Sequence, residues 1–219
     1  MSADTILKWI EGSGWLVLSS EPTLDAEVRA LALSRTKAEG GVAYIGMTMD
    51  DADDVMEDMA DLGAPTGYFV NILTEDDESI RTQLAEASMI VISGEHTADA
   101  LLDALQGAAL EGLRSAYELG AVILAETVAA TVFGSIMVLS AGRTATGLGW
   151  LEDSIIVTDV ASVAESPEAR AVLESHSAGI AVGIGDESAL VLGPGGVVEA
   201  WGQKIITIAL GGAISDKID

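Results

Sequence analysis

The chain has 219 residues, of which 49% are hydrophobic, and it carries 35 acidic residues against 10 lysines and arginines, a formal net charge of −25. A composition this apolar argues against disorder, and a surface this acidic repels phosphate backbones and so argues against nucleic-acid binding. Since the chain has no cysteine, disulfides and cysteine-based zinc sites are excluded.

The first 18 residues read MSADTILKWIEGSGWLVL, and no basic segment precedes an apolar one there. This is not the pattern of a signal peptide, so we expect a cytoplasmic protein. The length suits one α/β domain or two small ones, and no low-complexity linker or fixed-period repeat interrupts the sequence. We therefore expect residues 1–219 to form a single domain.

Apolar runs alternate with amphipathic segments along most of the chain. Several runs are continuous, as in strands covered on both faces, and the segments between them show the i, i+3, i+4 spacing of helices. In chain order the pattern predicts strand 15–20, helix 23–39, strand 41–47, helix 50–63, strand 67–73, helix 76–87, strand 88–94, helices 97–107 and 109–120, strands 121–126 and 154–160, helix 166–176, and strands 179–184, 188–193 and 204–210.

This alternation predicts an α/β fold, a three-layer sandwich in which a mostly parallel sheet has helices on both faces. The last three predicted strands follow one another quickly and are separated by the turn sequences GDE and GPGG. Such turns favour an antiparallel extension of the sheet at the C-terminal end.

The apolar stretch 120–142 is long enough to cross a membrane. Glu126 lies near its middle, however, where an ionisable side chain is costly in lipid. A buried strand that runs directly into a buried helix gives the same pattern, so no membrane partner is expected.

Within that stretch, residues 121–134 read AVILAETVAATVFG and have the strand–turn–helix outline of a nucleophile elbow. Thr127 falls at the switch from strand to helix, and Ala125 and Ala129 lie two residues to either side. Glycines commonly occupy both of those positions, because small residues let the helix approach the sheet. The outline therefore predicts an elbow with a threonine in the nucleophile position.

Longer stretches carry a resemblance to a known family. AEASMIVISGEHTADALLDALQGAALEGLRSAYELGAVILAETVAA resembles the region of the cyanophycinase and dipeptidase E (aspartyl dipeptidase) family of serine peptidases that runs from Gly-Gly-Asp/Asn-Gln to Gly-Thr-Ser-Ala-Gly-Ala. GLGWLEDSIIVTDVAS is similar to the family's Gly-Leu-Gly-Leu-Leu segment and Asp-x-His-Phe strand end. AVGIGDESALVLGPGGVVEAWGQ is similar to its Gly-Ile-Gly-Ile-Asp-Glu-x-Thr-Ala-Leu stretch. The resemblance covers about residues 14 to 203 and implies a class I glutamine amidotransferase-like fold.

The resemblance also implies where the catalytic groups belong. The nucleophilic serine falls on Thr127, and the histidine of Asp-x-His-Phe falls on Ala161, with Asp159 two residues earlier. The Gln of Gly-Gly-Asp-Gln falls on His96, and the Asp-Glu pair falls on Gly185 and Asp186. A hydroxyl is a poor nucleophile unless a base takes its proton, and losing one triad member typically removes about 10⁴-fold in rate. We therefore expect a degenerate peptidase without serine-peptidase activity.

An alternative keeps the enzyme active. His96 follows a strand next to the elbow strand, so it would act as a relocated base for Thr127, oriented by Glu95 or Glu126. Such a hydrolase would act on small acidic or Asp-Arg-type peptides. His176 is expected in a solvated position after a helix.

Acidic residues also follow several predicted strands, and two interpretations stay open for them. They would form a pocket for a basic side chain or a hard metal ion, or they are separate, solvated strand ends of a very acidic protein. The residues concerned are Glu21, Glu95, Glu126, Asp159 and Asp186.

The first functional hypothesis is a peptidase-like pseudoenzyme kept for binding or self-assembly. A high apolar fraction beside a high net charge indicates either an unusually large core or apolar surface buried against another copy. Because contiguous apolar patches usually mark interfaces, we expect a homo-oligomer. The acidic strand ends would bind a small cationic or peptide ligand. No metal site and no cofactor is predicted.

Overall fold

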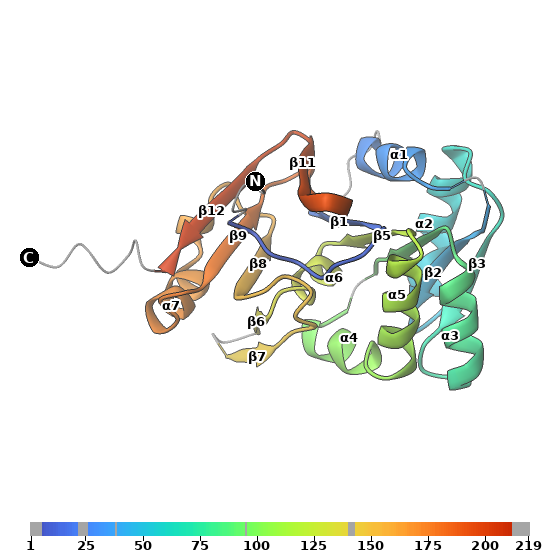
Figure 1. Ribbon diagram of the computed structural model, residues 1–219, viewed down its shortest axis with the longest axis horizontal. Coiled ribbons are helices and arrows are strands. Elements are labelled where there is room, and N and C mark those ends of the chain that lie inside the picture. The colour runs from blue at the N-terminus through green and yellow to red at the C-terminus, as the bar shows by residue number, and fades with distance from the viewer. Residues whose placement is uncertain (1–5, 22–25, 38, 95, 140–142, 212–219) are drawn as a thin grey trace, which may run out of the picture.

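The computed structural model describes residues 6–21, 26–37, 39–94, 96–139 and 143–211. Within these residues the strands form a larger sheet of seven and a smaller sheet of five (Figure 1). The larger sheet has the order β11-β10-β1-β5-β4-β2-β3. Its strands are β1 (Trp15–Ser19), β2 (Val42–Gly46), β3 (Gly67–Asn71), β4 (Met89–Ile92), β5 (Val122–Glu126), β10 (Ser188–Gly193) and β11 (Val197–Gly202).

The central strands of the larger sheet run parallel, as predicted, and only β10 and β11 are antiparallel to their neighbours. β5 lies between β1 and β4, and all five of its residues are buried. Full burial on both faces explains why this strand reads as a continuous apolar run.

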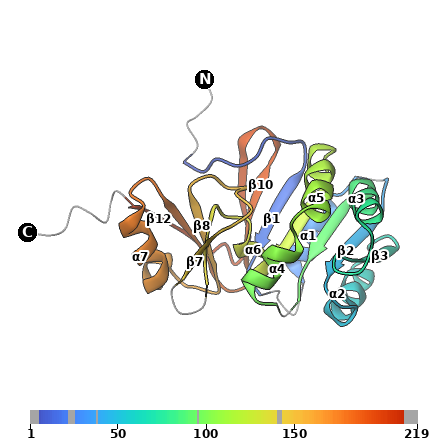
Figure 2. The same ribbon diagram turned by 90° about the horizontal axis from the view of Figure 1, so that it is seen from below.

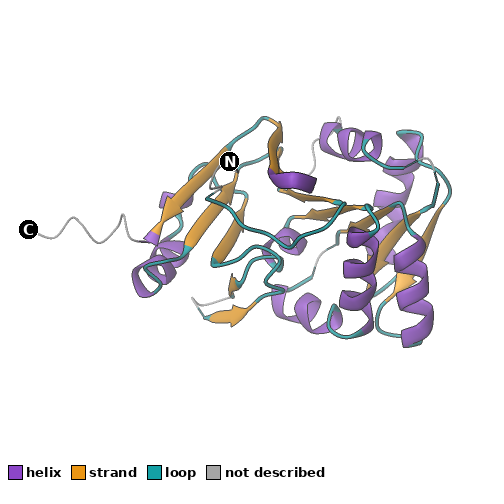
Figure 3. Cartoon of the chain, viewed as in Figure 1, coloured by secondary structure: helices purple, strands orange, loops and turns teal. Residues whose placement is uncertain are grey.

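Helices cover both faces of the larger sheet (Figure 2 and Figure 3). On one face α1 (Glu27–Ser34) and α2 (Asp50–Asp61) pack against alternate strand residues such as Val17 and Leu124. On the other face lie α3 (Asp77–Glu86), α4 (Ala98–Ala104) and α5 (Ala108–Glu118), packed on residues such as Leu18 and Ile123. The two apolar clusters, separated by the sheet, make the three layers.

Several helix ends follow from local sequence. The Asp76 carboxylate accepts hydrogen bonds from the N–H groups of Glu78 and Ser79 and so caps α3. Gly63, with φ 84°, follows α2 in the left-handed conformation that favours glycine. The helix predicted over residues 23–39 is observed as the shorter α1. It begins at Glu27, because Ala26 has the left-handed φ of 48° and so does not continue the helix backwards. Thr23, where the predicted helix starts, lies outside the described residues.

The smaller sheet has the order β12-β9-β8-β6-β7, and α7 (Pro167–Ser175) packs on one of its faces. Its strands are β6 (Ile136–Val138), β7 (Thr144–Thr146), β8 (Ser154–Thr158), β9 (Ile180–Ile184) and β12 (Ile206–Leu210). β8 runs parallel to β6 and β9, whereas β12 is antiparallel to β9.

The prediction for the last strands needs two corrections. The GDE turn joins β9 to β10, which belong to different sheets, so it makes no hairpin. The GPGG turn does make one, but with β11, a strand that the sequence did not reveal because its side chains are mostly half-exposed. β6 and β7, of three residues each, were also missed.

The apolar stretch 120–142 contains β5, a turn at Thr127, the short helix α6 (Val128–Thr131) and β6. Among the helices of the described residues, none has the length and apolar character needed to span a membrane.

Candidate functional site

The turn after β5 has the backbone of a nucleophile elbow. Thr127 adopts φ 51° and ψ −118°, and α6 begins at the next residue. A β-branched residue rarely adopts a positive φ, and such strain persists only where the surrounding structure enforces it. Here the Thr127 N–H donates to the Ser19 carbonyl of β1 at 2.9 Å. The structure therefore keeps the strained backbone of an elbow at Thr127, although a β-branched side chain makes that backbone costly.

Small residues allow this turn to close. Ala125, Ala129 and Ala130 are buried, so α6 lies close to the end of β5. Alanines replace the expected glycines without preventing the strand–turn–helix geometry.

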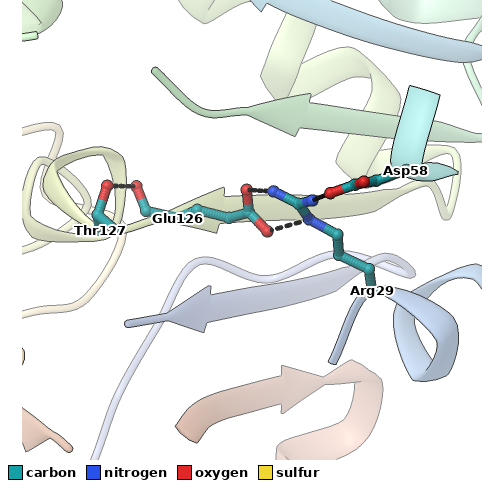
Figure 4. Close-up of polar contacts among 4 residues, drawn as sticks. All are labelled: Arg29, Asp58, Glu126 and Thr127. Atoms are coloured by element: carbon teal, nitrogen blue, oxygen red, sulfur yellow. Dashed lines mark hydrogen bonds and ion pairs between the residues drawn. The ribbon is translucent and has the colours of Figure 1, made fainter. Parts of the chain in front are cut away.

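The Thr127 hydroxyl is half-buried and hydrogen-bonded to its own backbone. Its Oγ1 donates to the Glu126 carbonyl oxygen at 2.8 Å (Figure 4). In this conformation the hydroxyl proton points to an amide carbonyl, which is a very weak base.

The Glu126 side chain points away from that hydroxyl, towards Arg29 of α1 (Figure 4). Arg29 Nε donates to Glu126 Oε1 at 2.8 Å, and Arg29 Nη2 donates to Glu126 Oε2 at 2.7 Å. Arg29 Nη1 donates to the Asp58 carboxylate of α2. Glu126 and Arg29 are 1% and 5% exposed. The fork of the guanidinium thus ties the residue before the elbow to both helices on this face.

Burial and charge act on the ionisable groups around this pair. Burial alone lowers the pKa of Arg29, but the hydrogen bonds and charges of Glu126 and Asp58 outweigh it and raise the pKa above its ordinary value. Burial raises the pKa of Tyr44 to about 12, against the smaller opposing effect of the Arg29 charge. Arg29 therefore stays cationic and Tyr44 stays neutral at physiological pH.

The carboxyl ends of other strands lie beside the elbow. The Ser20 N–H and hydroxyl both donate to the Ser188 carbonyl, at 3.0 and 3.2 Å, and the Ser188 N–H donates back to Ser20 Oγ at 3.1 Å. The Glu21 N–H donates to Asp159 Oδ1 at 3.1 Å. These bonds join the end of β1 to the start of β10 and the end of β8. Residues predicted for the site from distant parts of the sequence are thus brought together.

The acidic residues of this region differ in their surroundings. Asp159 is exposed, has φ 59°, and holds the Glu21 backbone. Asp186 is exposed in the turn before β10, where its carbonyl accepts a bond from the Ser188 hydroxyl. Glu126 is paired with Arg29, and Glu95 lies outside the described residues. Within the described part of the chain, no group of three or more His, Cys, Asp or Glu side chains is arranged to hold a metal ion.

The two histidines occupy different places. His96 is half-buried in the segment between β4 and α4, and its backbone N–H donates to the Gly94 carbonyl at 3.1 Å. His176 is exposed at the end of α7, where its Nδ1 lies 2.9 Å from Ser175 Oγ. Ala161, the residue in the place of the family's histidine, is exposed and follows β8.

A hollow of about 620 Å³ opens at the other end of the larger sheet. It is lined by residues 7–12, Glu152 and residues 193–196. Gly193 packs against Trp15, at the amino end of β1, whereas Thr127 follows the carboxyl end of β5. Ligands of parallel α/β sheets bind outside the carboxyl ends of the strands, so the hollow is not part of the elbow site.

Sequence reasoning missed Arg29 and Asp58. One signal was available for Arg29: it is a single cation within the apolar segment EVRALALS, as Glu126 is a single acid within an apolar run. Buried charges are almost always paired, so two isolated opposite charges in buried segments predict a contact. Asp58 gave no such signal, because α2 is acidic over most of its length.

Comparisons place the fold among known proteins. No protein-family model and no curated protein matches the sequence. A peptidase from an acI-B1 Actinobacterium matches with a TM-score of 0.64 at 18% identity, over 88% of this chain and 88% of that one. A protein from Listeria monocytogenes EGD-e, itself proposed to be a peptidase E, matches with a TM-score of 0.60 at 13% identity, over 87% of this chain and 99% of that one. The chain has a peptidase-E-like, class I glutamine amidotransferase-like fold.

Proposed function

We propose that the chain is a peptidase-E-like scaffold that has lost serine-peptidase chemistry and serves a binding or self-assembly role. The observation that carries the proposal is the bond from the Thr127 hydroxyl to the Glu126 carbonyl. In a working elbow the hydroxyl donates to an imidazole, which takes the proton during attack. The residue in the place of that imidazole is Ala161, whose methyl group takes no proton.

The buried carboxylate next to the elbow does not replace the missing base. Both oxygens of Glu126 are occupied by Arg29, and the side chain points away from the Thr127 hydroxyl. Arg29 holds the carboxylate on the α1 face of the sheet, so neither oxygen is directed at the Thr127 hydroxyl. Neither Ala161 nor Glu126 therefore assists the Thr127 hydroxyl.

A second candidate is a hydrolase that uses Thr127 with His96 as a relocated base. The strained backbone at Thr127 favours it, since strain of this kind concentrates at functional sites. His96 follows β4, the direct neighbour of β5 in the sheet. Its substrates would be small acidic or Asp-Arg-type peptides.

In the first candidate, the exposed carboxylates of Asp159 and Asp186 provide the binding chemistry. They follow β8 and β9, which are adjacent and parallel. A small cation or a peptide with a basic side chain suits two exposed acids in a chain of net charge −25.

Peptide hydrolysis separates the two candidates. The wild-type chain, Thr127→Ala and His96→Asn are incubated with isoaspartyl, aspartyl and arginyl dipeptides, and released amino acids are measured by mass spectrometry. The proposal predicts no turnover above the peptide alone for all three proteins. Turnover by the wild type that both substitutions abolish would establish the second candidate instead. Thermal melts of all three proteins show whether each variant is folded.

A further inference from the structure

The outer strand of the smaller sheet has the features of an interface. β12 pairs with β9 on one side and lies at the margin of the molecule, on the side opposite α2 and α3 (Figure 1 and Figure 2). Ile208 and Leu210 of β12 are 46% and 41% exposed, and Ile205, just before the strand, is 40% exposed. Edge strands are normally protected by charges, proline or covering segments, because an exposed apolar edge pairs with other strands. The sequence of β12, ITIAL, has none of those charges or prolines.

The other edge strands of the described sheets differ from β12. β3 has no exposed large apolar side chain among its residues, and β7 has only three residues. β11 exposes Val197 and Val198, at 39% and 43%, but it also carries Glu199, which is paired with Arg35. β12 therefore combines an uncharged sequence, exposed apolar side chains and an unpaired edge.

The register shows which backbone groups face outward. Gly185 N–H donates to the Ile205 carbonyl at 2.8 Å, and Gly211 N–H donates to the Gly179 carbonyl at 2.9 Å. In an antiparallel ladder such bonded residues alternate with residues whose N–H and C=O point the other way. Ile205 and Gly211 bond towards β9. The even-numbered residues between them, which include Ile208 and Leu210, therefore direct their N–H and C=O groups to the outer edge.

The same residues share one side-chain face. Ile206, Ile208 and Leu210 lie opposite Ile184, Val182 and Ile180 of β9, respectively. Val182 and Ile184 belong to the main apolar core, and Ile206 packs against it. The core thus continues to the outer strand and ends there in exposed isoleucine and leucine side chains.

The geometry points to a second copy of this chain as the partner, with two β12 strands pairing antiparallel about a twofold axis at Ile208. This arrangement places Ile208 opposite its own copy and Ile206 opposite Leu210. Every side chain on the exposed face then meets an apolar one, and the outward backbone groups bond across the axis. The two smaller sheets become one continuous sheet.

The symmetry of the strand favours a second copy over a different partner, because Ile206 and Leu210 lie two residues to either side of Ile208 and both are apolar. Two chains of net charge −25 repel each other over most of their surfaces, so they approach best where a strand has no charge. A cationic protein would instead be attracted to the acidic surface elsewhere. The interface supplies the partner for the self-assembly role and rests on that proposed function.

Sedimentation equilibrium of the full chain tests the association. We expect a monomer–dimer equilibrium that strengthens between about 10 mM and about 0.3 M NaCl, because salt shortens the Debye length and screens the repulsion. Ile208→Lys should weaken the dimer by about tenfold or more, since it places two like charges directly opposite each other. Leu73→Lys, at a 59% exposed position on the β3 side, makes the same charge change and should leave association unchanged.

Single cysteines test the register in a chain that has no cysteine of its own. Ile208→Cys places two cysteines on the axis, where Cα atoms of a bonded antiparallel pair lie about 5.5 Å apart, within the range that a disulfide spans. Leu210→Cys places its two copies about 13 Å apart along the strands, too far for a disulfide. We expect oxidation to cross-link the first variant and not the second.

A wild-type monomer at every salt concentration, or equal cross-linking of the two cysteine variants, would overturn the interface. A dimer that Ile208→Lys leaves intact would do the same. These results are separable from the peptide assay. If the chain is an inactive monomer, only the proposed interface is refuted. If it is a dimer that hydrolyses peptides, the proposed loss of activity is refuted and the interface stands.

Discussion

The carboxylate of Glu126 and the guanidinium of Arg29 form a buried bidentate pair, with N–O distances of 2.8 and 2.7 Å, at the residue immediately before the strained backbone of Thr127. The pair joins β5 to α1, and Arg29 continues the connection to Asp58 of α2. The elbow is therefore fixed from the helical layer on one face of the sheet while its hydroxyl stays bonded to its own backbone.

Breaking this pair should destabilise the chain. Glu126→Gln leaves the buried guanidinium without its main counter-charge, and removing one partner of a buried pair costs about 3 kcal/mol or more. The free energy of unfolding, measured by urea denaturation, should fall by that amount. Asp58→Asn, at a side chain that is 57% exposed, should change it by less than about 1 kcal/mol.

Replacing both partners should behave differently from replacing one. The double variant Arg29→Met with Glu126→Leu removes both charges, and apolar replacements of buried pairs are often neutral. We expect it to recover most of the stability lost in Glu126→Gln in the same urea titration. A double variant as unstable as the single one would show that the pair is needed for more than charge compensation.

The backbone at Thr127 should be relieved by glycine. With φ 51° and ψ −118°, the threonine is strained by about 1 to 3 kcal/mol, and glycine adopts this conformation without a Cβ clash. Thr127→Gly should therefore raise the melting temperature. The control Thr131→Gly, in α6, should lower it, because glycine is unfavourable within a helix. Equal losses in both variants would argue against strain at the elbow.

Tyr44 should make the chain less stable in alkali. Its pKa is raised from 10.0 to about 12 in the folded chain, so the unfolded chain loses the proton first as the pH rises. The stabilisation is complete below about pH 10 and declines as the pH approaches about 12. By about pH 11 the wild type should have lost about 1 kcal/mol more than Tyr44→Phe, measured as unfolding free energy in urea. Parallel curves for the two proteins would contradict this.

Much of the fold was predictable from the sequence. The alternation of fully buried strands with amphipathic helices identified the parallel core from β1 to β5, because covered strands are uniformly apolar. The division of the last strands between the two sheets was not predictable. β9 and β10 are separated by a short turn typical of hairpins, yet each pairs in a different sheet. That choice depends on which tertiary surfaces are left uncovered, which no local pattern records.

The position of the turn in the candidate site was predictable, but the pairing of its charged side chains was not. The strand–turn–helix pattern located the turn at Thr127, since small residues on both sides permit it. Glu126 was expected to face the same site, but strand alternation turns it to the α1 face, where Arg29 meets it. The direction of a side chain at a strand end depends on the register of the whole strand, and the partner comes from a distant segment.

Reaction with a fluorophosphonate, which labels activated hydroxyl nucleophiles, tests most directly whether Thr127 lacks a base. Intact mass is measured after incubation for the wild type, Thr127→Ala and His96→Asn. We predict no adduct on any of the three, because the hydroxyl donates to the Glu126 carbonyl and Ala161, in the place of the family's histidine, takes no proton. An adduct on wild-type Thr127 that disappears in His96→Asn would show an activated nucleophile and contradict the loss of peptidase chemistry.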